Sequence, residues 1–334
     1  RPFPKSEMRV FRAELTGLKP GTEYEFKVGN LPMSGKFRTM PSKATNSFTF
    51  VSGGDCDTNE HAVNNNMLAA KQDPMFALIG GDLGYDNGTS LDHAYDFVHN
   101  YSRTMIDRQG RMIPMVVCIG NHEVNGGYGK TRNEAPFYFA LHDGLYADKS
   151  YATLDFGDYL SLVLLDTGHC AKIDGEQTSW LDKELKERVD RSHVFAVNHV
   201  PSYPSHRKFE DDNGKEGTGA GSRKHWCPLF ERYNVDAVFE HHDHTFKRTY
   251  PMKDGMRNAN GVVYLGDGSW GKLRAPEPPE DRPYLAVASE AYHLTVHRLE
   301  GDKCHHVAMK EGGQVIDTIY TTSKRPMRSK GRKA

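Results

Sequence analysis

The sequence predicts an α/β fold in which two mixed β-sheets pack together and are flanked by helices, preceded by a partial β domain. Three observations predict it. Seven short apolar runs each end in a polar cluster, helical segments lie between several of them, and alternating strands occupy both ends of the chain. Runs of four to six apolar, often β-branched residues are typical of strands buried on both faces. Their alternation with helices indicates an α/β domain.

The composition limits the class of protein. The chain has 334 residues, or about two domains at roughly 150 residues each. Its 43 Lys and Arg against 44 Asp and Glu leave a net charge of −1, which gives no global attraction to nucleic acid or an anionic membrane. No apolar run approaches the ~18 residues of a membrane span. The five cysteines include no C-x-x-C pair, so zinc-ribbon spacing is absent and at most two disulfides could form.

The first 42 residues read as β structure. A Lys-Pro-Gly turn at residues 19–21 separates two alternating stretches, residues 11–18 and 22–28, and KFRTMP reads as a last strand ending at Pro41. This segment resembles the final strands of a fibronectin type III module with its amino-terminal part missing. The expected core residues are Leu15, Leu18, Tyr24 and Phe37.

Residues 46–322 form the predicted α/β domain. The strands are FTFVSGGD, ALIGGD, MVVCIGN, LVLLD, VFAVNH, AVFEHH and VVYLGD, and residues 291–322 read as a closing β-meander. Helices are predicted in HAVNNNMLAAKQ, LDHAYDFVHNYSRTMI and SWLDKELKERV. In the last of these, Leu181, Leu185 and Val189 share a face, and the capping-box spacing of Ser179 and Asp182 predicts its start. Residues 201–222 read as a long functional or disordered loop, and residues 323–334 as a basic disordered tail.

Polar side chains follow nearly every predicted strand. In an open α/β sheet, ligands bind at the carboxyl ends of the strands. A single Asp there is often a helix cap, and an isolated His is often an ordinary core residue, but five strand ends of this kind favour a metal site. The candidates are Asp55, Asp57, Asp82, Tyr85, Asn121, His122, His199, His242 and His244.

This donor set suits two adjacent cations. A carboxylate can bridge two ions, while imidazoles, an amide and further carboxylates fill the remaining positions. Two such ions clamp a phosphoryl group and acidify a bridging water. The set has no thiolate beyond a possible Cys56 and is too rich in His for magnesium, so it predicts iron, zinc or manganese.

The order of the motifs resembles the metallophosphoesterase superfamily. GGD55, GGD82-L-G-Y85, GN121-H122-E123, VNH199 and H242-D-H244 are similar to its five motifs in sequence order. Tyr85, three residues after the second Asp, resembles the purple acid phosphatase branch, as does the fibronectin-like segment. The resemblance covers about residues 10–322.

The resemblance implies a dinuclear centre. Fe(III) would be held by Asp55, Asp82, Tyr85 and His244. A second divalent ion (Fe, Zn or Mn) would be held by Asp82, Asn121, His199 and His242. A metal-activated hydroxide would attack phosphorus while His122 contacts the phosphate and protonates the leaving oxygen. A Tyr85 phenolate would colour a ferric protein. The resemblance also implies a secreted or periplasmic location.

Two positions depart from the family pattern. Asp57 stands where the purple branch usually has Gly, and could be a further ligand, an orienting acceptor or a helix cap. Glu240-His241 replaces a small residue and Gly. These bulkier polar groups are expected to crowd the metal site or to change its charge. His241 itself is expected behind the site or at the surface.

The remaining polar residues have less specific interpretations. His206, in the 201–222 loop, is a candidate phosphate contact or a solvent-facing histidine. Asp166 and Asp267 are expected to make hydrogen bonds at strand ends. Structural roles are expected for His93, His99, His293 and His297.

The leading functional hypothesis is a dinuclear metallohydrolase that cleaves phosphate monoesters, with a phosphorylated small molecule or other phosphoester as its partner. A phosphodiesterase, nucleotidase or phospholipase on the same site is the nearest alternative. A catalytically weakened phosphate-binding or adhesion protein is the alternative of another class.

Overall fold

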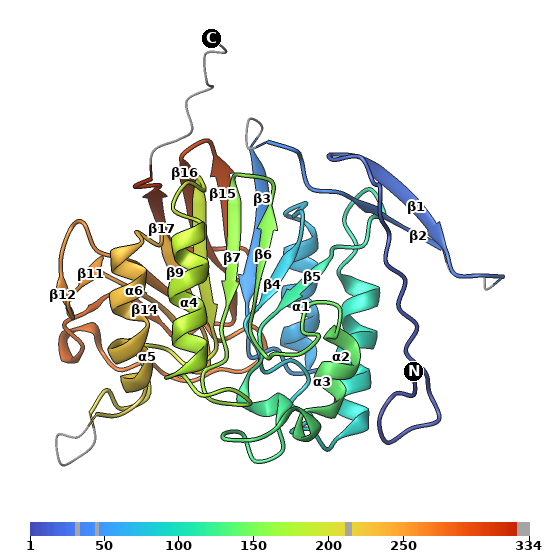
Figure 1. Cartoon of the computed structure of the whole chain (residues 1–334), viewed down its shortest axis with the longest axis horizontal. Coiled ribbons are helices and arrows are strands. Elements are labelled where there is room, and N and C mark those ends of the chain that lie inside the picture. The colour runs from blue at the N-terminus through green and yellow to red at the C-terminus, as the bar shows by residue number, and fades with distance from the viewer. Residues whose placement is uncertain (31–33, 44–46, 211–215, 326–334) are drawn as a thin grey trace, which may run out of the picture.

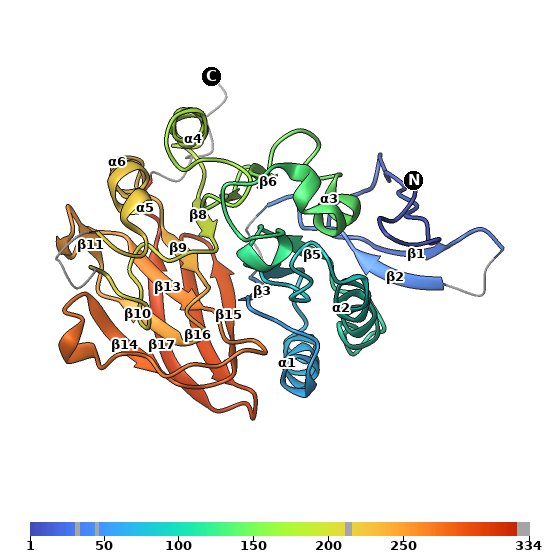
Figure 2. The same ribbon diagram turned by 90° about the horizontal axis from the view of Figure 1, so that it is seen from below.

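Two β-sheets face each other and carry helices on their outer sides (Figures 1 and 2). The structure, a computed structural model, describes residues 1–30, 34–43, 47–210 and 216–325, without the side chain of Asp267. The predicted architecture of two mixed sheets flanked by helices is confirmed. The predicted disordered tail lies almost entirely outside the described residues.

The first sheet has six strands in the order β17-β16-β15-β3-β4-β5. Its parallel half is β3 (Phe48–Gly53), β4 (Ala77–Ile79) and β5 (Met115–Val117). Its antiparallel half is the predicted meander, β15 (His293–Glu300), β16 (Lys303–Lys310) and β17 (Val315–Thr322), which joins β3 through β15.

The second sheet has seven strands in the order β14-β10-β13-β9-β8-β7-β6. Its parallel centre is β7 (Leu160–Leu164), β8 (His193–Asn198), β9 (Ala237–Glu240) and β13 (Val263–Asp267). Antiparallel strands complete it: β6 (Ala152–Phe156), β10 (Phe246–Thr249) and β14 (Leu285–Ser289). All seven apolar runs of the sequence are therefore strands. A small hairpin, β11 (Met252–Lys253) and β12 (Met256–Arg257), lies outside this sheet.

Alternate residues of the parallel strands face the two layers of core. Phe50, Phe195 and Phe239 meet between the sheets, with ring centroids 5.2 to 6.3 Å apart. On the other face of the second sheet, Leu181 and Leu185 pack in a separate apolar cluster with residues of β7 and β8. Both faces of these strands are covered, which explains their continuous apolar sequence.

Helices cover the outer faces. They are α1 (Glu60–Ala70), α2 (Leu91–Thr104), α3 (Pro136–His142), α4 (Glu176–Glu187), α5 (Ala220–His225) and α6 (Cys227–Arg232). Short 3₁₀ turns lie at Asn121–Glu123, Arg132–Glu134 and Pro279–Asp281.

The predicted start of α4 at Ser179 is wrong. The helix begins at Glu176, after Gly175 with φ of 74°. Ser179 lies inside the helix, where its hydroxyl donates to the Gly175 carbonyl instead of capping an amide. Leu181 and Leu185 are buried as predicted, but Val189 lies beyond the helix end and is 47% exposed.

The amino-terminal segment forms a two-stranded ribbon, β1 (Glu23–Lys27) and β2 (Ser34–Arg38). Tyr24 and Phe37 stack across it at 5.7 Å. Residues 11–18 are not a strand and Leu15 is exposed, so the expected packing of Leu15 is wrong. Two strands alone cannot enclose a core, and the fibronectin-like assignment stays a prediction.

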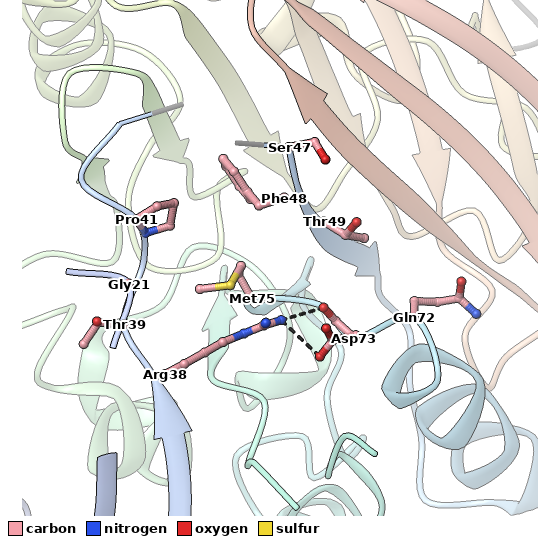
Figure 3. A pocket seen from close by; sticks show the side chains of 10 residues that line it. All are labelled: Gly21, Arg38, Thr39, Pro41, Ser47, Phe48, Thr49, Gln72, Asp73 and Met75. Atoms are coloured by element: carbon pink, nitrogen blue, oxygen red, sulfur yellow. Dashed lines mark hydrogen bonds and ion pairs between the residues drawn. The ribbon is translucent and has the colours of Figure 1, made fainter. Parts of the chain in front are cut away.

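A pocket of about 310 Å³ lies where this segment meets the start of β3 (Figure 3). Arg38 crosses it and donates to the carbonyl and carboxylate of Asp73, at 2.7 and 3.1 Å. Arg111 pairs with the same carboxylate at 2.7 Å. The pocket lies at the amino ends of β3 and β4, opposite the strand ends that carry the predicted site.

Two glycines of the repeated Gly-Gly-Asp sequence make room for the ring of His241. A Cβ at Gly54 would lie 2.7 Å from His241 Cδ2, and one at Gly80 would overlap the ring itself. The glycines that precede Asp55 and Asp82 therefore let β9 approach β3 and β4 closely.

Gly80→Ala should lower the free energy of unfolding by about 1–3 kcal/mol, the usual cost of overpacking a core. Urea unfolding of the metal-free protein measures it. Gly144→Ala is the matched control, because its added methyl would meet only the flexible Arg12 side chain, at 3.4 Å. Equal stability of the two variants would contradict the close approach of His241.

Candidate active site

The predicted ligands converge at the carboxyl ends of β3, β4, β5, β8 and β9. Asp55 follows β3, Asp82 follows β4, Asn121 follows β5 and His199 follows β8. His242 and His244 follow β9, and Tyr85 lies on the turn after Asp82. Both sheets contribute, so the site lies where their strand ends meet.

The backbone at these positions is unusual. Five of the seven predicted ligands have the left-handed φ that non-glycine residues rarely adopt, between 53° and 74°. A non-glycine residue in this conformation lowers the stability of the fold by roughly 1–2 kcal/mol. Such residues cluster at functional sites. They turn the chain sharply after each strand and aim the side chains inward. The residues are Asp55, Asp82, Tyr85, His242 and His244.

One half of the site is built around His199. Its Nε2 atom lies 3.0 Å from His242 Nδ1, 3.1 Å from Asn121 Oδ1 and 3.2 Å from Asp82 Oδ2. The other ring nitrogen, Nδ1, bonds to the Gly80 carbonyl at 2.8 Å and so fixes the ring. Four predicted ligands of one ion therefore meet at one point.

The other half is built around His244. Its Nε2 atom lies 3.0 Å from Asp55 Oδ1 and 3.0 Å from the Tyr85 hydroxyl, which is 3.3 Å from the same carboxylate oxygen. The second oxygen of Asp55 accepts the His242 amide at 2.8 Å and links the two halves. All seven predicted ligands thus form one continuous cluster.

The cluster concentrates charge in a buried place. Asp55, Asp82 and His199 are fully buried, and His242 and His244 nearly so. Burial opposes the charge of Asp82, but His199 holds the pKa of that carboxyl well below its usual range. Burial also opposes the charge of His199, while Asp82 raises its pKa. Burial and the charge of His199 lower the pKa of His242.

Glu123, in the GNHE motif, joins two of the strand ends. Its carboxylate accepts the amides of Asp82 at 2.8 Å, Leu83 at 2.7 Å and Gly120 at 2.7 Å. The His122 amide in turn donates to Asp82 Oδ1 at 2.7 Å. The turn after β5 is therefore fastened to the turn after β4, a role that the sequence analysis did not assign to Glu123.

Asn87 orients His122. The side-chain oxygen of Asn87, Oδ1, lies 2.5 Å from His122 Nδ1. The backbone N–H of Asn87 donates to the His122 carbonyl at 2.6 Å. The His122 ring also packs on Tyr85, with centroids 4.1 Å apart. An amide oxygen only accepts, so Nδ1 carries a proton and Nε2 is the nitrogen available for chemistry. The Asn-Gly pair five residues after Asp82 predicts a turn here but gives no sign of the contact with His122.

Two further residues at the site were missed by sequence reasoning. The Tyr128 hydroxyl lies 3.3 Å from His242 Nε2, and its ring packs on His169 at 4.8 Å. Arg207 donates to the His242 carbonyl and pairs with Asp243 at 3.0 Å. Tyr128 lies in a Gly-rich stretch and Arg207 in the long loop, and neither had a periodic or motif signal.

Of the three roles expected for Asp57, its contacts decide between cap and acceptor, and a role as a metal ligand stays a prediction. Its carboxylate accepts the Thr58 amide at 2.7 Å, the Asn59 side chain at 3.2 Å and the Lys272 ammonium at 2.5 Å. Asn59 caps α1, so the interpretation of Asp57 as the cap is wrong. The Lys272 ammonium also lies 4.6 Å from the centre of the Tyr85 ring. Asp57 therefore acts as an acceptor that orients Asn59 and Lys272.

Cys56 packs in the main apolar core, and it is not among the residues whose ligand atoms lie within 4.8 Å of one another at the strand ends.

The expectation that Glu240 changes the charge of the metal site is wrong. Its carboxylate is fully buried and pairs with the Lys247 ammonium at 2.5 Å, which neutralises it. Its other oxygen accepts the Ser202 amide at 2.6 Å, so it anchors the chain after β8. His241 lies behind the site as expected, against Gly54 and Gly80, and its Nδ1 atom is 3.1 Å from the Asn198 carbonyl.

The remaining candidates lie as follows. The ring of His206 bonds to the Ala275 carbonyl at 2.8 Å and its amide to Asp243, so its contact with phosphate stays a prediction. Asp166 accepts four backbone amides of residues 168–171, which confirms its hydrogen-bonding role. The side chain of Asp267 lies outside the described residues.

Lys247→Met should destabilise the protein by about 3–5 kcal/mol, because it leaves the Glu240 carboxylate buried without its counter-charge. The double variant Lys247→Met/Glu240→Gln should recover most of that loss, and urea unfolding compares the two. A single variant as stable as the unaltered protein would contradict the pairing.

Comparisons with known proteins agree with this geometry. The family model described as "Calcineurin-like phosphoesterase" matches residues 27–246. The chain is 28% identical to an uncharacterized protein of Mycobacterium tuberculosis over 75% of its own length and 53% of that protein's. It is 23% identical to mouse acid phosphatase type 7, covering 95% of this chain and 77% of that one. It is 27% identical to purple acid phosphatase 15 of Arabidopsis thaliana, over 81% and 56%.

Among solved structures, the purple acid phosphatase PPD1 of yellow lupin superposes with a TM-score of 0.74 at 17% identity, covering 92% of this chain and 60% of that one. This likeness concerns the fold. The chain spans about half the length of its mycobacterial relative. No helix among residues 1–30, 34–43, 47–210 and 216–325 is long and apolar enough to cross a membrane.

The family model covers well over half of the chain, so this chain belongs to the calcineurin-like phosphoesterase family.

Proposed function

We propose that the chain is a dinuclear metal-dependent hydrolase of phosphate monoesters. The observation that carries the proposal is the meeting of seven side chains with metal-binding chemistry at five strand ends, with His122 beside them. The relatives named acid phosphatase support the reaction class.

The residues present fit a pair of metal ions. Asp55, Asp82, His199 and His242 each offer a ligand atom, and these atoms all lie within 4.8 Å of one another. The buried Oδ2 atom of Asp82 has only the ion-pair contact with His199 at 3.2 Å among the described residues, and a cation would complete its pairing. Carboxylate, imidazole, amide and phenol donors suit iron, zinc or manganese.

The seven side chains divide between two positions. Asp55, Tyr85 and His244 would hold one ion, which we assign as Fe(III) because a phenolate favours the ferric state. Asn121, His199 and His242 would hold the second, a divalent Fe, Zn or Mn ion. Asp82 would bridge them. When bound, the pair would neutralise the phosphate and supply a water of lowered pKa as the nucleophile.

The protein's own groups then orient the ester and move one proton. His122, held by Asn87 through Nδ1, would act in its imidazolium form and donate the Nε2 proton to the leaving oxygen. General acid help of this kind is worth roughly 10²–10⁴-fold. Arg207 and Lys272 lie beside the site, but each already pairs with a carboxylate, Asp243 and Asp57 respectively. The choice of a monoester therefore rests on the relatives named acid phosphatase.

Asn121→Ala tests the site. We expect the variant to remain folded, to lose the second ion and to hydrolyse on the order of 10²-fold more slowly. Substitution of residues that only support metal ligands already lowers metal affinity or activity roughly 10–100-fold. Elemental analysis and turnover of chromogenic monoester and diester substrates measure this. Asn125→Ala, at a nearby exposed side chain, is the control. Two ions and full turnover in Asn121→Ala would reject the assignment.

Asn87→Ala tests the placement of His122. It removes the acceptor that holds Nδ1, so kcat should fall about 10-fold or more with little change in KM. The loss should be larger for an alkyl phosphate than for an activated aryl phosphate, because a poor leaving group depends more on protonation. Asn87→Asp keeps an acceptor and should recover most of the activity. An equal loss on both substrates would contradict the role of His122 as the acid.

A further inference from the structure

Three buried side chains in the closing meander form a second cluster of metal-ligand chemistry. They are His297 of β15 and Cys304 and His306 of β16. One ligand atom from each lies within 4.8 Å of the other two. None of the three belongs to the strand-end site, and the sequence analysis gave His297 only a structural role.

The strand register brings them together. His297 and His306 are direct partners across the antiparallel pair of β15 and β16. Cys304 lies two residues before His306 and therefore faces the same side of the sheet. The two Nδ1 atoms are 2.7 Å apart, and Cys304 Sγ is 3.9 Å from His306 Nδ1.

Hydroxyl groups on the neighbouring strands hold the outer edges of both rings. Ser52 Oγ of β3 is 2.7 Å from His297 Nε2, and Thr321 Oγ1 of β17 is 2.8 Å from His306 Nε2. A hydroxyl can donate or accept, so both imidazoles can carry their proton on Nε2 and present Nδ1 lone pairs toward each other. Metal-bound histidines usually have their second nitrogen held in this way.

The surroundings are dry and aromatic. Phe50 stacks on His297 at 4.5 Å, and Phe239 packs on it at 4.6 Å. All three candidate donors are at most 1% exposed. Burial raises the pKa of the Cys304 thiol well above its usual value, so without an ion this sulfur carries its proton.

We propose that His297 Nδ1, His306 Nδ1 and Cys304 Sγ bind one thiophilic d¹⁰ ion, of the Zn(II) or Cu(I) class, as a structural site. The donor set contains no carboxylate, and thiolate with imidazole selects soft and borderline ions. Binding releases one proton, from the Cys304 thiol. The ring that carries its proton on Nδ1 in the metal-free protein would carry it on Nε2 in the bound state, where its hydroxyl partner, Ser52 or Thr321, would accept it.

The required movement is small. Nitrogen ligands about 2.0–2.1 Å from zinc in tetrahedral geometry are roughly 3.3 Å apart, and a sulfur at about 2.3 Å lies roughly 3.6 Å from each nitrogen. The two rings would therefore separate by roughly half an ångström, while the sulfur would approach His306 slightly. The ion would join β15 to β16 directly, and β3 and β17 through the hydroxyls. Ser52 lies three residues before Asp55, so the site would stiffen the strand that leads into the active site.

Cadmium tests the proposal, because its bond to a thiolate gives an ultraviolet charge-transfer band that oxygen and nitrogen ligands do not. The full chain is refolded with Cd(II), since the site is closed in the folded protein, and excess ion is removed. We expect a band equivalent to one thiolate per chain, lost in Cys304→Ser and kept in Cys227→Ser, a second buried cysteine in α6. Zn(II) added during refolding should raise Tm in the unaltered protein but not in Cys304→Ser.

Several outcomes would overturn the proposal. They are the absence of a band in the unaltered protein, an equal band in Cys304→Ser, or loss of the band in Cys56→Ser instead, which would place the thiolate at the strand-end site. Cys304→Ser lies outside that site, so its phosphoester hydrolysis should be unchanged. His306→Asn is a second variant should Cys304→Ser fold poorly, and it should also lose the band.

Discussion

The structure depends on the burial of two carboxylates beside a group of imidazoles. Asp55 and Asp82 are both fully buried at the ends of neighbouring parallel strands. A buried charge is stable only when it is paired or bound to a metal. His199 and His244 supply part of that compensation, at 3.2 and 3.0 Å. Metal ions would supply the rest. Much of the surrounding architecture serves to hold these four side chains in place.

The chain's departures from the family pattern are compensated locally. Glu240 is matched by Lys247 within the core, and Asp57 by Lys272 near the Tyr85 ring. Each of these two acids pairs with a lysine from elsewhere in the chain. The strand-end cluster therefore keeps its own charge, although both acids lie close to it in sequence.

Sequence patterns could predict the parallel strands because both faces of these strands are covered, which makes the runs continuously apolar. They could predict the candidate ligands because each follows such a run. They could not predict Asn87 or Arg207, whose roles depend on contacts to His122 and His242 across the fold. The predicted start of α4 was wrong because the Ser179 hydroxyl donates to the Gly175 carbonyl instead of accepting a backbone amide. The capping-box spacing alone does not reveal which of these two bonds forms.

The central claim is that the strand ends form one dinuclear metal centre that hydrolyses phosphoesters. Elemental analysis of the purified protein, read together with its visible spectrum and monoester turnover, tests it most directly. The purified protein should hold two metal ions per chain including iron, show a tyrosinate charge-transfer band, and have turnover that is lost on chelation and regained on reloading. Protein that holds no metal, and that no added ion makes active, would contradict it.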